Sequence, residues 1–440
     1  MNYTEESLIY ALNACEEEGL SARIRLHSSL TKTAGYNVFT DKFPNIHGNL
    51  DEYPALVGFH IVDEPSWSQL DVVETVYVPW FNDNYTDSGL EFFVNMLSGY
   101  STAMGSLRDA NGEVVTNNGT YYNKYGLYEG NDAYNIKTFQ TEKVVLTAEE
   151  KATFLTVYHN KWLGILATVN SANKCFSHDC YPFFDNQAGY LQSAEDDTSL
   201  LEGYETYVLD DWFARSLNMA IKAAENGYKF GAHIQAFDQG GETYPDAPYR
   251  LPTTAAEIKW QVYLNIAMGA KLIDYFGYDN NSGGSYMTLA GQPLPMYYLV
   301  QETNAELDAV DHVFASFHTW VGVKTFTPAG SAVSNAFQKV ADMELASLTG
   351  VSNLTTDREL VVGEMIDGNG NHGYMLVGYD DPLNGNSTQV EMNFDGADGF
   401  IVYRGGERTL VEATEGALAL TLSAGEGVFV IPVYMENTNA

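Results

Sequence analysis

Strand-like and helix-like segments alternate along about the first three hundred residues of this 440-residue chain. Short apolar runs bounded by glycine, proline or polar residues predict strands, and longer amphipathic stretches predict helices. Strands that alternate with helices predict a parallel sheet with helices outside it. The predicted strands cover residues 22–27, 57–62, 90–97, 174–179, 229–235 and 271–279, and the predicted helices cover 4–19, 69–81, 147–167, 207–226, 253–269 and 296–316.

The count of strands limits the choice of architecture. Six strands are predicted, whereas a closed (β/α)8 TIM barrel needs eight. The chain also opens with a helix, where a barrel would open with a strand. We therefore expect residues 1–322 to form a barrel in which strands three to eight are visible and the first two βα units are missing. An open, doubly wound α/β sheet is the alternative.

The pattern changes near residue 325 to short strands separated by turn clusters such as Asp367-Gly368-Asn369-Gly370. This spacing is typical of an all-β sandwich. We expect residues 323–440 to form a C-terminal β-sandwich domain. Its predicted strands cover residues 360–365, 372–379, 389–394, 399–403, 417–422 and 427–433.

Charge excludes several classes of partner. The chain has 22 basic and 58 acidic residues, a net charge of −36. Nucleic acid and anionic membrane surfaces both require clustered Lys and Arg, so neither is expected as a partner. Aromatic residues make up 13% of the chain, a content that suits either sugar stacking or a large core with tyrosine-rich loops. The composition favours a neutral ligand.

Cysteine usage and hydropathy add further limits. Three cysteines give no disulfide framework, and no Cys/His spacing predicts a zinc site, so no metal or cofactor is expected. No apolar run is long enough for a transmembrane segment. The first residues lead directly into a helix, so no signal peptide is predicted. Nothing in the sequence specifies an oligomeric state.

Chemistry in a parallel barrel is found where the strands end. The run from Val57 to Val62 ends in Asp63-Glu64, and Pro65 prevents the strand from continuing. Glycoside hydrolysis needs carboxyl groups on both sides of an oxocarbenium-like transition state, one as proton donor and one as nucleophile or base. The predicted strand ends carry His27, Asp63, Glu64, Asn95, His178, Asp179, Tyr181, Gln235, Tyr278 and Asp279.

Three segments resemble the clan-A-like barrel glycosidases, in particular the barrel β-galactosidases and a bacterial branch with an Asp-Glu-Pro strand-four motif. Residues 58–66 resemble their fourth strand, residues 179–183 their sixth, and residues 250–276 their seventh helix and eighth strand. The resemblance implies an oligo- or polysaccharide substrate and Glu64 as the general acid/base. It also implies an extracellular or cell-surface location in a bacterium. Without the resemblance, Asp63-Glu64-Pro65-Ser66 is also a plausible cap for the following helix.

The chain departs from that family at strand seven, where Gln235 stands at the position of the nucleophilic glutamate. An amide cannot form a glycosyl-enzyme ester, so three possibilities stay open. Another carboxylate acts instead, or the acetamido group of the substrate acts with Asp63 orienting it, as in hexosaminidase-type enzymes. Otherwise the barrel binds sugar without cleaving it. The candidate carboxylates are Asp179, Asp238, Glu242 and Asp279.

The remaining strand-end residues are candidates for substrate contact. We expect some of the aromatic rings of Trp67, Tyr181, Phe183, Tyr275 and Tyr278 to stack on a sugar, the alternative being a core at the top of the barrel. The polar candidates for substrate contact are His27, Asn95, His178, Gln235 and Asp279. For His27, His60 and His178, a hydrogen-bonded structural role is the alternative.

Overall fold

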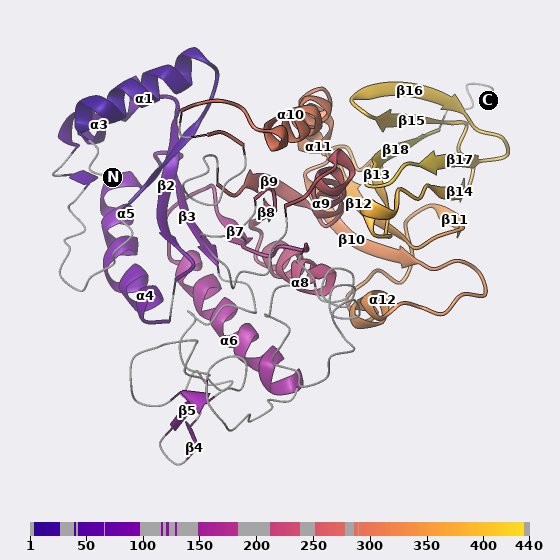
Figure 1. The fold of residues 1–440 in the computed structure, drawn as a ribbon, viewed down its shortest axis with the longest axis horizontal. Coiled ribbons are helices and arrows are strands. Elements are labelled where there is room, and N and C mark those ends of the chain that lie inside the picture. Colours follow the sequence, from indigo (N-terminus) through magenta and orange to yellow (C-terminus); the bar gives the residue numbers. More distant parts are fainter. Residues whose placement is uncertain are drawn as a thin grey trace. The chain divides into compact units, whose positions relative to one another are not determined.

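The structure is a computed structural model in which the chain divides into two compact units (Figure 1). The first unit comprises residues 1–179 with 226–229, and the second comprises 180–225 with 230–440. The residues that the structure describes are 4–26, 39–40, 43–65, 67–96, 116–117, 120–122, 128–129, 148–183, 212–237, 251–277, 286–288 and 290–434.

The first unit is an α/β layer whose strands run parallel in the order β1-β2-β3-β7. The strands are β1 (Ala22–Arg25), β2 (Leu56–Asp63), β3 (Glu91–Met96) and β7 (Cys175–His178). Asp63 lies opposite Asn95, and Asn95 lies opposite Ser177. This register brings the carboxyl ends of three neighbouring strands together.

The helices of the first unit confirm the predicted alternation. They are α1 (Glu5–Glu17), α3 (Pro44–Gly48), α4 (Trp67–Val72), α5 (Val78–Tyr85) and α6 (Ala148–Ala167), with short turns η1 (Leu50–Glu52) and η2 (Val73–Tyr77). One helix is predicted over residues 69–81, whereas the structure has two α-helices here, α4 and α5, joined by the π-helical turn η2. Three further short strands, β4 (Thr116–Asn117), β5 (Thr120–Tyr122) and β6 (Tyr128–Glu129), form a separate sheet.

Aromatic side chains attach the helices of the first unit to its sheet. Phe59 on β2 contacts Trp80 of α5 with ring centroids 5.5 Å apart, and Phe92 on β3 contacts Phe81 of α5 at 5.2 Å. Phe92 also stacks on Trp162 of α6. All five rings are buried, and aromatic pairs of this kind contribute beyond their buried area. The packing holds β2 and β3 in place from the side of α5 and α6 (Figure 1).

Gly58 in the middle of β2 is required by the close approach of β3. A Cβ atom at this position would lie 2.6 Å from the Cβ of Glu91 and 2.7 Å from its carbonyl oxygen. We expect Gly58→Ala to lower the free energy of unfolding by about 1–3 kcal/mol, because the core would be overpacked. Gly164→Ala is the control, since that exposed helical position has open space and should gain about 0.5–1 kcal/mol. Equal urea midpoints for the two variants would contradict this account.

The second unit begins with further α/β elements. The parallel strands β8 (Lys229–Ile234) and β9 (Ala270–Tyr275) pair with each other. The helices are α8 (Trp212–Glu225), α9 (Ala255–Ala267), α10 (Pro295–Asp308) and α11 (Asp311–Ser316). Helix α9 begins at a capping box formed by Thr254 and Glu257. The prediction of one continuous helix over residues 296–316 is wrong, because Ala309 and Val310 separate α10 from α11.

A β-sandwich completes the second unit. One sheet has the order β10-β12-β13-β18-β15-β16 and the other has the order β11-β14-β17. Apolar residues of both sheets form its core, including Val362, Phe400, Met392 and Leu418. The elements are β10 (Thr319–Phe326), α12 (Asn335–Val340), β11 (Val351–Thr356), β12 (Leu360–Ile366), β13 (His372–Gly378), η7 (Pro382–Asn384), β14 (Thr388–Phe394), β15 (Gly399–Arg404), β16 (Glu407–Glu412), β17 (Ala417–Leu422) and β18 (Gly427–Val433).

All six strands predicted for the α/β part are present, and the sandwich strands predicted from residue 360 onward are confirmed. Strands β10, β11 and β16 were missing from the prediction. Closure into an eight-stranded barrel and a domain boundary at residue 322 stay predictions. Across the described ranges, no helix has the length and apolar character needed to cross a bilayer.

Candidate functional site

Three polar side chains meet at the carboxyl ends of β2, β3 and β7. The Nδ2 atom of Asn95 donates to Oδ1 of Asp179 at 2.7 Å and to Oδ1 of Asp63 at 3.2 Å. We call Asp63, Asn95 and Asp179 the strand-tip cluster. One neutral amide therefore uses both of its N–H groups on two carboxylates.

Ser177 on β7 fixes the orientation of that amide. Its Oγ atom donates to Oδ1 of Asn95 at 3.2 Å, so the oxygen end of the amide faces Ser177 and the nitrogen end faces the carboxylates. Asn95 is 1% exposed and Asp179 is 5% exposed. Hydrogen bonds to ionised acceptors are stronger than neutral ones, and burial removes competing water. The cluster is therefore a fixed arrangement of side chains.

Asp63 is the member of the cluster that solvent reaches most readily, with 26% of its side chain exposed. Its Oδ2 atom lies 3.4 Å from Nη2 of Arg25, and its Oδ1 atom lies 3.8 Å from Nε2 of His60. Half-exposed ion pairs of this kind contribute little to stability. The guanidinium of Arg25 places positive charge beside the carboxylate, which favours a defined position for Asp63 at the end of β2.

Glu64 follows directly and has an unusual backbone. Its φ angle is 48°, in the left-handed region, which costs a non-glycine residue about 1–2 kcal/mol. The backbone is held on both sides, because the N–H of Glu64 donates to the Asn95 carbonyl at 2.8 Å and Tyr158 of α6 donates to the Pro65 carbonyl at 2.6 Å. The side chain of Glu64 is exposed. Strain maintained by surrounding contacts is a feature of functional sites.

The other predicted site residues have different surroundings. His178 is buried in β7, and Tyr181 is buried with its ring 4.7 Å from that of Phe237. Their roles in substrate contact stay predictions. His27, Tyr278 and Asp279 lie outside the described residues, as do the alternative carboxylates Asp238 and Glu242 and the side chain of Trp67, the first residue of α4.

In the second unit, Gln235 holds the main chain of Phe183. Its Oε1 atom accepts from the Phe183 N–H at 2.7 Å, and its Nε2 atom donates to the Phe183 carbonyl at 2.7 Å. Gln261 of α9 makes the same kind of pair with the main chain of Gln235, at 2.8 and 3.1 Å. Gln235 is fully buried. At this position an amide serves as both donor and acceptor, which an ionised carboxylate cannot do.

We expect Gln235→Glu to destabilise the protein and not to raise any glycosidase activity. An ionised carboxylate would face the Phe183 carbonyl oxygen, so the free energy of unfolding should fall by about 1–3 kcal/mol. Urea unfolding and hydrolysis of aryl glycosides are the two measurements. Gln235→Met is the control for loss of the two hydrogen bonds without charge. Faster hydrolysis by Gln235→Glu would show that this position accepts a nucleophile.

Arg25, Ser177 and Gln261 were not among the predicted site residues. Arg25 and Ser177 each lie on a predicted strand, two residues before its predicted end. The strand register, rather than the sequence spacing, brings Ser177 to Asn95. Gln261 is an amide between the buried apolar residues Trp260 and Val262 of helix α9, and an amide in such surroundings is a signal for a buried hydrogen bond.

The donor set at the strand-tip cluster is carboxylate and amide. Within the part of the chain that the structure describes, no group of three or more His, Cys, Asp or Glu side chains is arranged to hold a metal ion. The arrangement can position a sugar hydroxyl or an acetamido group by hydrogen bonds, and the exposed Glu64 adds a carboxyl group able to transfer a proton.

No protein-family model matches the chain, and no curated protein matches it either. A search of solved structures finds a 4-O-α-L-rhamnosyl-β-D-glucuronidase from Fusarium oxysporum 12S, at 9% identity and a TM-score of 0.42, covering 96% of this chain and 79% of that one. It also finds a GH27 β-L-arabinopyranosidase variant from Geobacillus stearothermophilus, at 10% identity and a TM-score of 0.33, covering 94% and 97%.

A third similar structure is an α-amylase from Anoxybacillus, at 7% identity and a TM-score of 0.35, covering 97% of this chain and 73% of that one. The three proteins are thus described as a glucuronidase, an arabinopyranosidase and an amylase. TM-scores below 0.5 are too low to establish a shared fold, so the function must be inferred from the residues of this chain.

Proposed function

We propose that this protein is a glycoside hydrolase acting on a neutral carbohydrate, with Glu64 as its general acid/base. The observation that supports the proposal most is the strand-tip cluster beside Glu64. Two carboxylates joined by one amide lie at the ends of adjacent parallel strands, and the exposed glutamate follows the first of them in a held, left-handed conformation.

The proposed chemistry is proton donation to the glycosidic oxygen by Glu64. As the bond to the leaving group breaks, positive charge develops on the sugar ring, and a nearby carboxylate stabilises it. Water then adds to the anomeric carbon and returns a proton to Glu64. Asp63 is the partly exposed member of the cluster and is proposed to face the substrate. Asp179 is buried and is proposed to hold Asn95, although it also stays the second candidate for nucleophile.

The charge of the protein supports a neutral substrate. A net charge of −36 repels anionic ligands over the distance of a Debye length. The described surroundings of Asp63 offer one partly exposed guanidinium, that of Arg25. One half-exposed cation is poorly suited to hold a phosphate or sulfate group, whereas carboxylate and amide oxygens suit sugar hydroxyls.

A substrate-assisted, hexosaminidase-type mechanism is the second candidate, and Gln235 favours it. Both polar atoms of the Gln235 side chain are engaged with Phe183, so position 235 itself supplies no carboxylate. The acetamido group of the substrate would then attack the anomeric carbon, with Asp63 orienting it and Glu64 donating the proton. Sugar binding without turnover is the third possibility, with the same observation in its favour.

A panel of 4-nitrophenyl glycosides separates the three mechanisms. Hydrolysis of simple hexosides or pentosides supports the two-carboxylate mechanism. Hydrolysis confined to 2-acetamido substrates, with selective inhibition by a thiazoline analogue, supports substrate assistance. Saturable binding of the matching sugars without release of 4-nitrophenol, at enzyme concentrations sufficient for a single turnover, would overturn the proposal that the protein is a hydrolase.

A further inference from the structure

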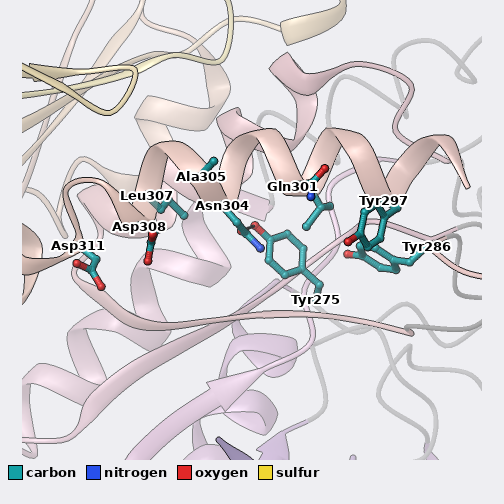
Figure 2. Close-up of a pocket in the computed structure, with 10 residues that line it drawn as sticks. Tyr275, Tyr286, Tyr297, Gln301, Asn304, Ala305, Leu307, Asp308 and Asp311 are labelled. Atoms are coloured by element: carbon teal, nitrogen blue, oxygen red, sulfur yellow. Dashed lines mark hydrogen bonds between the residues drawn. The ribbon is translucent and has the colours of Figure 1, made fainter. Parts of the chain in front are cut away.

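A cavity of about 730 Å³ lies along helix α10 in the second unit. Figure 2 shows its lining residues: Tyr297, Gln301, Asn304 and Asp308 come from successive turns of α10, and Tyr275 at the end of β9 faces the helix. We call this cavity the α10 groove. It shares no residue with the strand-tip cluster, since all of its lining residues belong to the second unit.

The polar residues of the groove form a row. Residues 297, 301, 304 and 308 are spaced by three or four positions, so they share one face of the helix. Gln301, Asn304 and Asp308 are exposed there. One turn of helix advances about 5.4 Å, so an amide or carboxylate recurs at a spacing close to the length of one pyranose unit in a linear chain.

Tyr275 fixes the orientation of the central amide. Its hydroxyl donates to Oδ1 of Asn304 at 2.8 Å, which directs the amide nitrogen of Asn304 away from that contact. Burial raises the pKa of Tyr275 well above its usual value, so the hydroxyl stays a donor throughout the neutral range. The ring of Tyr286 packs edge-on against Tyr275 at 6.2 Å. The amide is therefore positioned before any ligand binds.

We propose that the α10 groove binds a neutral oligosaccharide, in addition to any sugar held at the strand-tip cluster. Tyrosine rings supply faces for a pyranose, while the amides and Asp308 supply paired donors and acceptors for vicinal hydroxyls. The volume lies within the range of small-ligand sites. The proposal goes beyond hydrolysis and needs no turnover, because it involves no residue of the proposed catalytic centre.

The chemistry of the groove favours a saccharide over two other ligands. Asp308 and Asp311 line the same groove and would repel an anionic ligand such as a nucleotide. A peptide strand could pair with β9, which among the described strands pairs with β8 alone. Recognition of a peptide would require apolar pockets for alternate side chains, whereas the exposed α10 positions of this groove are mainly amides and carboxylates.

Calorimetric titration tests the proposal with xylotetraose, cellotetraose, maltotetraose and chitotetraose as probes, in the full chain carrying Glu64→Gln so that no probe is cleaved. We expect at least one probe to bind saturably. Tyr297→Ala and Asn304→Ala should each weaken that binding at least tenfold. Tyr10→Ala is the control, because Tyr10 on α1 is 77% exposed and does not line the groove, so this variant should leave binding unchanged.

Several outcomes would overturn the proposal. One is that none of the four probes binds at millimolar concentration. Another is that binding is lost on Asp63→Ala but unaffected by Tyr297→Ala and Asn304→Ala, which would place the sugar at the strand tips. Binding of an extended peptide in place of every saccharide would overturn it as well. Groove-dependent binding in a protein that hydrolyses no glycoside would support the groove and refute the proposed hydrolase.

Discussion

Glu64→Gln is expected to lower the hydrolysis of 4-nitrophenyl glycosides by about 10²–10⁴-fold, the usual contribution of a general acid. The amide keeps the size of the side chain but has no acidic proton to transfer to the leaving oxygen. The side chain is exposed, so the thermal midpoint should stay close to that of the wild type. The measurement is the initial rate at saturating substrate, with kcat and KM determined separately.

The leaving group distinguishes proton donation from a structural role. A 2,4-dinitrophenyl glycoside departs without assistance from an acid, so bond cleavage in Glu64→Gln should be slowed much less with this substrate than with the 4-nitrophenyl one. Glu16→Gln on the exposed surface of α1 is the control for the same change of charge, and it should leave both rates unchanged. Equal losses for both leaving groups would refute proton donation, and full activity of Glu64→Gln would exclude any essential role.

The sequence predicts the buried strands well because their apolar runs are strong and end at turn residues. Strand β2 is such a run, with most of its side chains buried. Strands β11 and β16 were missed for the opposite reason. Residues 351–356 are largely polar, and five of the six residues of β16 are exposed. Edge strands of this kind are stabilised by main-chain pairing with a neighbour, which no local pattern of hydrophobicity reports.

The candidate site was likewise predictable in part: the sequence indicates its residues but not their contacts. Strand ends are visible in the sequence, so Asp63, Asn95 and Asp179 are predictable as site residues. The bridging role of Asn95 depends on strand register, which places residue 95 between residues 63 and 177. A shift of one residue would turn the amide to the other face of the sheet. The sequence cannot supply that register, because the strands are joined by long segments rather than tight hairpins.

Gln235 shows a second limit. Gln235 stands at the end of a predicted strand, at the position where the barrel glycosidases have their nucleophilic glutamate. Both facts predict that it contacts the substrate. In the structure its side chain makes two hydrogen bonds to the main chain of Phe183. A residue more than fifty positions away along the chain determines the direction of this amide. The surroundings of Asn95 depend on strand register, and those of Gln235 depend on the main chain of a distant residue. Sequence spacing reports neither.

Asn95→Asp is expected to be the most destabilising of the substitutions proposed for this protein. The wild-type amide donates to both Asp63 and Asp179, whereas an introduced carboxylate would donate to neither and would repel both. Asn95 is 1% exposed, so water cannot compensate. An uncompensated buried charge costs about 3–5 kcal/mol, and we expect the free energy of unfolding to fall by that amount near neutral pH.

Asn13→Asp, at an exposed position of α1, is the control and should change the free energy of unfolding by less than about 0.5 kcal/mol.

The pH dependence identifies the cause of this loss. Burial and two neighbouring carboxylates should raise the pKa of the introduced carboxyl in the folded state above its unfolded value of about 3.9. A group with a raised folded pKa is tolerated below its unfolded pKa, and its destabilisation grows as pH rises through the folded pKa. The gap in urea midpoint between wild type and Asn95→Asp should therefore be small near about pH 4 and large near about pH 7. A gap of the same size at both pH values would show that lost packing, rather than charge at the strand-tip cluster, destabilises the variant.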